Sequence, residues 1–205
     1  MIRVLLADDH KIVRDGLKGI LAATADLRAA GEAASGDEAL ALVKAGDYDV
    51  VMLDMSMPGL SGMDLIKRLK VEKPKLRILV LSMHGEQQYA VRALKAGASG
   101  YLNKDSAAEM LVGAIRKIAG GGVHITETAA ASLLQAGEKS RHEALSDREF
   151  EVLRLLAEGL GPTEIGDKLH LSVKTVSTHK TRILEKLRLG STAELVRYAL
   201  DNKLI

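Results

Sequence analysis

The sequence contains no cysteine and no tryptophan, and aromatic residues make up only 2% of its 205 residues. Without cysteine the chain can form no disulfide, no thiolate nucleophile and no cysteine-ligated zinc site, which suits a reducing compartment. No apolar run approaches the roughly 20 residues that a membrane helix needs, and the one at the N-terminus is too short for a signal peptide. We therefore expect a soluble cytoplasmic protein with no membrane partner.

What the chain does contain is enough aliphatic material for a packed core. Hydrophobic residues make up 47% and charged residues 27%, and the net charge is only +2. This composition excludes a disordered chain, and the length favours one or two domains. Five short apolar runs, separated by segments with helical spacing, predict βαβ units and a parallel sheet. The expected strands are Arg3–Ala7, Arg28–Ala33, Val50–Asp54, Arg77–Ser82 and Gly100–Asn103.

The pattern changes after residue 120. Three glycines at 120–122 end the fifth helix, and a connector with a short helix at Glu127–Gln135 follows. No strand-like run occurs beyond it, and four helices are expected. Pro162 suits the first turn of the second of these helices. Only three residues, 170–172, separate that second helix from a long third helix, Val173–Leu187. We predict a five-stranded, doubly wound parallel α/β domain at 1–120, a flexible linker at 121–144 and a small all-α helix-turn-helix domain at 145–205.

Capping boxes of the form Ser-x-x-Glu support several of these helix starts. They begin at Ser35, Ser106, Ser146 and Ser191. In such a box the serine hydroxyl and the glutamate carboxylate satisfy backbone N–H groups that have no partner inside the helix.

Polar side chains follow four of the five expected strands. Asp8 and Asp9 follow the first strand, Asp54 ends the third, Ser82 ends the fourth and Lys104 follows the fifth. Because ligands of open parallel sheets bind at the carboxyl ends of the strands, these side chains are expected to converge. Singly, each has a plainer interpretation as a loop acid, helix cap, turn hydroxyl or surface lysine. Together at four strand ends, they favour a site.

Three neighbouring carboxylates repel one another unless a cation joins them. Mg²⁺ suits such oxygen ligands and leaves room for phosphate oxygens. Asp54 could then attack a phosphorus atom, while Mg²⁺ and Lys104 neutralise the transferred group and the Ser82 hydroxyl binds one of its oxygens. The residues thus predict phosphoryl transfer to Asp54.

The long helix of the C-terminal part is locally basic, with five cations from Lys174 to Arg188 against Glu185 alone. In a helix-turn-helix, the N-terminal half of the second helix of the motif enters the major groove. Small hydroxyl residues there reach base edges, and cations mostly meet phosphates. His179 is either a phosphate contact or a packed residue, and the alternative for the whole stretch is a solvated basic face. The candidate DNA-binding residues are Lys174, Thr175, Ser177, Thr178, His179, Lys180, Thr181 and Arg182.

Both halves resemble known families. The segments LLADDH, VVMLDMSMPGLSG, LVLSMH and AGASGYLNKD closely resemble the receiver domain of bacterial two-component response regulators. The segment LSDREFEVLRLLAEGLGPTEIGDKLHLSVKTVSTHKTRILEKL resembles the LuxR-type helix-turn-helix. Their order is that of the NarL/FixJ family of transcription factors, and the resemblance covers nearly the whole chain. It implies a flavodoxin-like receiver and a protein that is not an enzyme.

The resemblance also implies roles for individual residues. Asp54 would be the phosphoryl acceptor, and Asp8 and Asp9 would bind Mg²⁺ together with the backbone carbonyl of Ser56. Lys104 would contact the phosphoryl group. Ser82 and Tyr101 would form a switch pair, although Tyr101 alone would suggest ordinary packing.

The partners implied by the resemblance are a sensor histidine kinase, DNA and a second copy of the chain. The last helix resembles the family's dimerisation helix, so an inverted-repeat site is expected. RNA polymerase is a further possible partner that the resemblance implies. Phosphorylation would thus control dimerisation and DNA binding.

Two alternatives to this interpretation remain open. An aspartyl-phosphate phosphatase of the haloacid dehalogenase kind would need an Asp-x-Asp pair, but residue 56 is serine. A phosphorylation-independent DNA-binding regulator would need an inert receiver, against which the complete set of acids, Lys104 and Ser82 argues.

Overall fold

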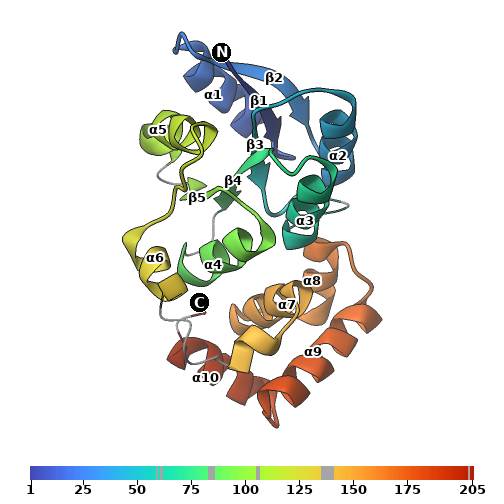
Figure 1. Cartoon of the computed structure of the whole chain (residues 1–205). Coiled ribbons are helices and arrows are strands. Elements are labelled where there is room, and N and C mark those ends of the chain that lie inside the picture. The colour runs from blue at the N-terminus through green and yellow to red at the C-terminus, as the bar shows by residue number, and fades with distance from the viewer. Residues whose placement is uncertain (59, 61, 83–85, 105–106, 135–140, 203) are drawn as a thin grey trace. The chain divides into compact units, whose positions relative to one another are not determined.

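The computed structural model covers all 205 residues and describes all of them except 59, 61, 83–85, 105–106, 135–140 and 203. The chain divides into two compact units, residues 1–134 and 135–205 (Figure 1). No described helix combines the length and the apolar character needed to cross a membrane.

The first unit is built on one parallel sheet with the strand order β2-β1-β3-β4-β5. This arrangement confirms the predicted doubly wound sheet. Observed and expected strands agree to within one residue at each end. The strands are β1 (Ile2–Ala7), β2 (Leu27–Ala33), β3 (Val50–Asp54), β4 (Arg77–Ser82) and β5 (Gly100–Asn103).

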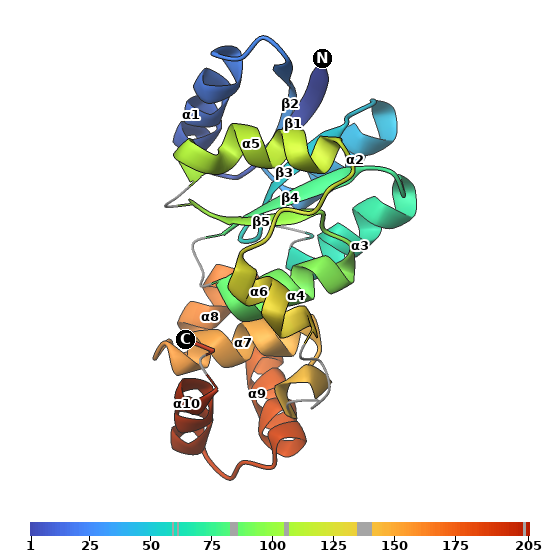
Figure 2. The same ribbon diagram turned by 60° about the vertical axis from the view of Figure 1, so that its left-hand side comes forward.

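Helices cover both faces of this sheet (Figure 2). The helices are α1 (Lys11–Ala22), α2 (Gly36–Ala45), α3 (Gly62–Glu72), α4 (Glu86–Ala96) and α5 (Ala107–Ala119). On one face, α1 and α5 pack over alternate strand residues such as Leu6, Met52 and Leu102. Neighbouring residues point to the opposite face, where α2, α3 and α4 pack side by side. Burial on both faces explains why the strands are apolar throughout.

The predicted linker at 121–144 contains a β-bridge and a helix up to Leu134, while its residues 135–140 lie outside the described part of the chain. His124 forms a parallel bridge with Gly100 of β5, and its carbonyl accepts a hydrogen bond of 2.9 Å from the Tyr101 N–H. The next helix, α6 (Glu127–Leu134), packs against α4 and buries Ala129 completely. The connector up to Leu134 therefore belongs to the first unit.

The second unit is helical, as predicted. A short 3₁₀ helix, η2 (Arg141–Ala144), precedes α7 (Asp147–Ala157), α8 (Pro162–Leu169), α9 (Val173–Leu187) and α10 (Thr192–Asp201). The core of this unit is apolar and fully buried: Val152, Ile165, Val176, Ile183, Leu187, Leu195 and Ala199. Gly166 lies under the turn between α8 and α9, where an added Cβ would fall 2.7 Å from the Leu171 carbonyl oxygen. Glycine therefore permits the close approach that joins the two helices.

Serine caps begin α2, α7, α9 and α10. The box at Ser146 is reciprocal, since Ser146 Oγ accepts from the Glu149 N–H at 3.3 Å and Glu149 Oε2 accepts from the Ser146 N–H at 2.7 Å. At Ser35 and Ser191 the glutamate bonds the N–H one residue earlier. The predicted box that begins at Ser106 lies outside the described residues.

Replacing Ser146 by alanine is expected to lower the free energy of unfolding of the second unit by about 1 kcal/mol, because the Glu149 N–H loses its acceptor. Urea unfolding followed by circular dichroism measures this loss. Ser177→Ala is the matched control, since Ser177 is exposed in the interior of α9, where alanine is the better helix former. Equal stability of Ser146→Ala and the wild-type protein would refute the importance of the cap.

Candidate functional site

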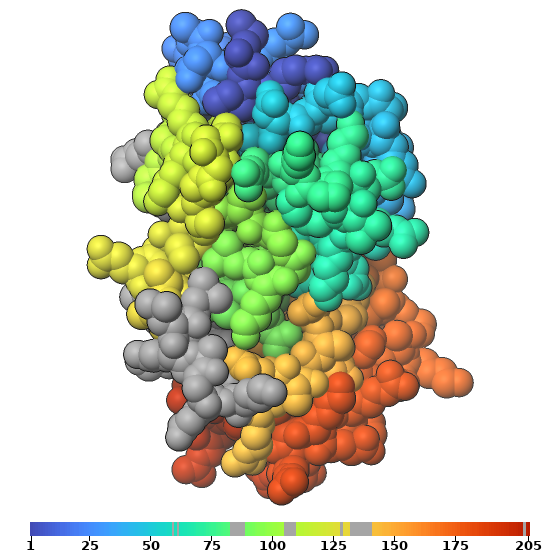
Figure 3. All heavy atoms as spheres, in the orientation of Figure 1, coloured from blue at the N-terminus to red at the C-terminus, as the bar shows by residue number. Residues whose placement is uncertain are grey.

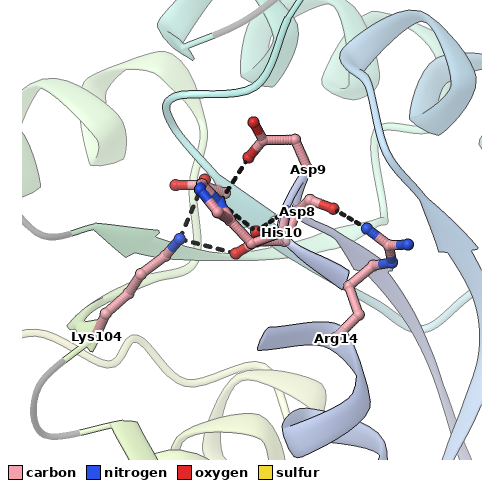
Figure 4. A network of polar contacts seen from close by, with 6 residues as sticks. Asp8, Asp9, His10, Arg14 and Lys104 are labelled. Atoms are coloured by element: carbon pink, nitrogen blue, oxygen red, sulfur yellow. Dashed lines mark hydrogen bonds and ion pairs between the residues drawn. The ribbon is translucent and has the colours of Figure 1, made fainter. Parts of the chain in front are cut away.

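Four acidic or imidazole side chains gather at the carboxyl edge of the sheet. Asp8, Asp9, His10 and Asp54 each offer a ligand atom, and these atoms lie within 4.8 Å of one another. Figure 4 shows Asp8, Asp9 and His10 beside Lys104. Asp8 and Asp54 are almost fully buried, at 1% and 3% exposure, whereas Asp9 is exposed. They converge because β1 and β3 are neighbours in the sheet, as the strand-end argument predicted.

Lys104 closes this cluster from the end of β5. Its Nζ lies 2.7 Å from Asp8 Oδ2 and 3.1 Å from Asp54 Oδ2. Burial alone would lower the pKa of Lys104, but the hydrogen bond to Asp8 and the attraction of Asp54 outweigh it, so the pKa is raised. Lys104 is therefore a charged ammonium that links two carboxylates.

The ionised form of the Asp54 carboxylate is disfavoured in this site. Burial raises the pKa of Asp54 above its ordinary value, and nearby Asp8 adds to the effect. Lys104 and the backbone N–H of Ser56 oppose the shift without cancelling it. Among the described residues, Asp54 Oδ2 accepts no well-aligned hydrogen bond, although Lys104 Nζ is within ion-pair distance. The distance supports a Coulombic pair, and the poor alignment leaves oxygen lone pairs available.

This donor set suits a hard cation. Carboxylate oxygens are the ligands that Mg²⁺ prefers, and an available oxygen on Asp54 beside Asp8 and Asp9 meets that requirement. A divalent cation would also relieve the repulsion between two buried carboxylates. The acidic cluster could therefore hold a metal ion.

The remaining predicted residues of this unit lie at the same edge or just behind it. Ser82 is buried at the end of β4, in register with Asn103 of β5. Tyr101 is buried on β5 and pairs with Val80, two residues before Ser82 on β4. Alternation along the two strands therefore turns Tyr101 and Ser82 toward the face covered by α4, opposite to Leu102. Ser56 is exposed in the turn after β3. Its role as a metal ligand stays a prediction.

The predicted DNA-binding residues lie on α9, which Figure 3 shows in orange to red at the surface of the second unit. The exposed ones are Lys174, Ser177, Thr178, Thr181 and Arg182, while Thr175, His179 and Lys180 are partly covered. The hydroxyls of Ser177, Thr178 and Thr181 donate to carbonyls four residues earlier. Their hydroxyl hydrogens are thus engaged, while the three side chains remain exposed.

His179 is a packed residue in this structure. Its Nδ1 is buried and makes no hydrogen bond to a described residue, and burial lowers the pKa of the imidazole. Of the two interpretations that the sequence left open, packing is the one that this geometry favours.

Two residues near the acidic cluster were not among the predicted site residues. His10 Nδ1 lies 2.9 Å from Asp9 Oδ1 and 3.2 Å from Asp8 Oδ1, and Arg14 Nη1 donates to the backbone carbonyl of Asp8 at 2.6 Å. The sequence carries a signal for His10, which directly follows the two acids. No spacing rule connects Arg14 to a carbonyl six residues earlier.

Comparisons with known proteins agree with this geometry. Residues 4–116 match the family described as response regulator receiver domain, and residues 143–199 match bacterial regulatory proteins of the luxR family. Oxygen regulatory protein NreC of Staphylococcus carnosus is 38% identical over 215 residues, which cover 100% of this chain and 99% of the relative. Transcriptional regulatory protein MctR of Rhizobium johnstonii is 35% identical, with 100% and 95% covered.

Solved structures add the same architecture. The RcsB response regulator of Salmonella typhimurium is 31% identical with a TM-score of 0.64, over 97% of this chain and 98% of that one. RcsB bound to the promoter rprA with the phosphomimetic BeF3- gives a TM-score of 0.67 at 31% identity, over 96% and 97%.

A receiver fold followed by a LuxR-type DNA-binding unit defines a response regulator, which regulates transcription and is not an enzyme. The chain belongs to the NarL/FixJ family of response regulators.

Proposed function

We propose that Asp54 accepts a phosphoryl group and that this modification controls DNA binding by the second unit. The observation that carries the proposal is the buried Asp54 carboxylate, whose Oδ2 is available beside Lys104. An oxygen of Asp54 attacks the donor phosphorus, and a P–O bond forms. The bond from phosphorus to the donor breaks, and the leaving group keeps its electron pair.

The neighbouring residues have distinct roles in this step. The ammonium of Lys104 is already within 3.1 Å of Asp54 and compensates negative charge on the transferred group. Ser82, at the end of the next strand, supplies a hydroxyl for one phosphoryl oxygen. Asp8, Asp9, Asp54 and the Ser56 carbonyl would hold Mg²⁺, which when bound supplies neutralisation of phosphoryl oxygens.

The signal would leave the site through β5. A phosphoryl group adds a charge of about −2 beside Lys104 and Ser82. Ser82 and Tyr101 face the same side of the sheet, and the Tyr101 N–H is bonded to His124. The segment from His124 leads into α6, which packs on α4. A shift of Ser82 and Tyr101 therefore biases the elements that continue toward the second unit.

The phosphoryl donor in the cell is a phosphohistidine of a sensor kinase, as the receiver class implies. The target is DNA, met by α9. RcsB, a structural relative, has been solved as dimers bound to DNA. A dimer of this chain would form through α10, where Leu200 is 57% exposed, and would bind an inverted repeat. RNA polymerase is a further partner of such a complex.

The proposal is tested by the intact mass of the protein after incubation with Mg²⁺ and a small acyl phosphate. One phosphoryl increment is expected, and chelation of Mg²⁺ should prevent it. Borohydride reduces an aspartyl phosphate to homoserine, so peptide mapping should find homoserine at position 54. An increment mapped elsewhere would overturn the assignment. No increment with an acyl phosphate or a phosphorylated kinase would favour an inert receiver that binds DNA without phosphorylation.

A further inference from the structure

Arg14, in the first half of α1, connects the acidic cluster to the edge strand β2. Its Nη1 donates to the Asp8 carbonyl oxygen at 2.6 Å, and its Nε donates to Glu32 Oε2 at 3.1 Å (Figure 4 shows the contact with Asp8). The Arg14 side chain is only 13% exposed. A planar guanidinium can hold two acceptors in a fixed relation, which suits it to this bridging place.

Glu32 is itself held in place on the other side. Lys18 Nζ lies 2.8 Å from Glu32 Oε1, and this contact, followed by Arg14, keeps the pKa of Glu32 low against the opposing effect of burial. The carboxylate is thus ionised and shared between two cations. Lys18 also pairs with Asp15 at 2.8 Å, so its ion pairs are with Asp15 and Glu32.

Strand β2 therefore holds Asp8 from both sides of its backbone. The Asp8 N–H donates to the Ala33 carbonyl at 3.1 Å, and the Asp8 carbonyl is reached from Glu32 through Arg14. Asp8 follows the last residue of β1, where pairing within the sheet ends. These two contacts hold the Asp8 backbone, from which the carboxylate reaches the His10 N–H at 2.8 Å and Lys104 Nζ at 2.7 Å.

We propose that Arg14 is a positioning residue for the metal-binding acids, held by Glu32 and acting through the Asp8 backbone. The inference rests on the proposed function, because it concerns the same acidic site. Arg14 does not touch the reacting atoms. It keeps Asp8 in the orientation that a cation requires, as the groups that hold metal ligands do elsewhere.

A positioning role and a purely electrostatic role predict opposite results. Arg14 carries a positive charge near the cluster, and a positive charge repels Mg²⁺. If charge alone mattered, a neutral residue at position 14 would bind Mg²⁺ more tightly. If position matters, the same change weakens binding, because the Asp8 backbone loses one of the contacts that hold it. The sign of the change in affinity therefore separates the two roles.

The experiment is a calorimetric titration of the full-length protein with MgCl₂, without a phosphoryl donor. Arg14→Met and Arg14→Lys are compared with the wild-type protein, and Lys18→Met is the control. Lys18→Met removes a similar charge from the same carboxylate, and among the described residues Lys18 forms its ion pairs with Asp15 and Glu32. Thermal unfolding by circular dichroism verifies that each variant is folded.

Both Arg14 variants are expected to bind Mg²⁺ about 10-fold to 100-fold more weakly, the usual effect of removing a group that holds a metal ligand. Arg14→Lys should be weakened although it keeps the charge, because a lysine cannot bridge Asp8 and Glu32 with a planar fork. Lys18→Met should bind like the wild-type protein or slightly more tightly. If Arg14→Met does not fold, Arg14→Lys alone decides the question.

Unchanged or tighter Mg²⁺ binding by the folded Arg14 variants would overturn the inference. That outcome would leave the proposed function intact, since the phosphorylation of the wild-type protein is measured separately. Failure of the wild-type protein to bind Mg²⁺ at all would instead overturn the metal site and the inference together. An equal weakening in Lys18→Met would also reject the inference, because it would assign the effect to charge around Glu32.

Discussion

The Asp54→Asn protein is expected to take up no phosphoryl group and yet to be more stable than the wild-type protein at neutral pH. Asparagine has nearly the shape of aspartate but cannot form the acyl phosphate bond. Incubation with Mg²⁺ and acyl phosphate should leave its mass unchanged. Its DNA binding should not respond to the donor. A phosphoryl increment of normal size in this variant would contradict the assignment of Asp54.

The gain in stability follows from the pKa of Asp54. Burial raises this pKa in the folded protein, so the folded state binds the proton more tightly than the unfolded chain does. The stabilisation from proton binding is complete below the unfolded pKa, about 4, and is lost as the pH rises through the raised folded value. At neutral pH the wild-type protein therefore holds an unfavourable buried charge, which asparagine removes.

We expect Asp54→Asn to raise the free energy of unfolding by about 1–3 kcal/mol at neutral pH, the range for relieving a poorly satisfied buried polar group. The gain should shrink toward pH 4. Urea unfolding with a metal chelator at both pH values measures it. Asp9→Asn is the control, because Asp9 belongs to the same cluster but is exposed, and surface changes usually stay within about 0.5 kcal/mol. A less stable Asp54→Asn protein would show that Lys104 compensates the charge fully.

The same residues explain how much of the site was visible in the sequence. Strands buried on both faces are apolar throughout, so an acid at the end of one, such as Asp54, stands out. Because parallel strands all end at one edge of the sheet, the sequence alone predicted that Asp8 and Lys104 lie near Asp54, and they do. The burial of Asp54 and the alignment of its hydrogen bonds depend on packing, which no pattern of residue types contains.

Arg14 and the connector show where that reasoning stops. Arg14 reaches a backbone carbonyl and a glutamate 18 residues away, and every residue has a carbonyl, so the sequence offers no mark of this contact. In the connector, the glycines at 120–122 predicted the end of α5, and the helix does end at Ala119. His124 then pairs with β5, because an exposed strand edge can accept one more residue.

DNA binding by the full-length protein is expected to weaken about 10³-fold when NaCl rises from about 50 to about 200 mM. Each copy offers Lys174, Lys180 and Arg182 on α9 for phosphates, so a dimer makes about six contacts and releases a similar number of counterions. The salt dependence is measured by fluorescence anisotropy of a fluorescein-labelled duplex of random sequence titrated with phosphorylated protein. This measurement does not require the operator sequence. Binding that is independent of salt would contradict the role of α9.

Lys180→Ala sharpens this test. In a dimer it removes two phosphate contacts, so the slope of log affinity against log salt should fall by about 2, and all sequences should be weakened alike. Lys44→Ala is the matched control, because it removes the same charge from α2, where Lys44 faces Glu72 at 3.6 Å. If both variants reduce the slope of log affinity against log salt equally, the net charge of the protein attracts the DNA. If only Lys180→Ala reduces this slope, the contact surface is α9. The hydroxyls of Ser177, Thr178 and Thr181 on that helix are then placed to read the DNA sequence.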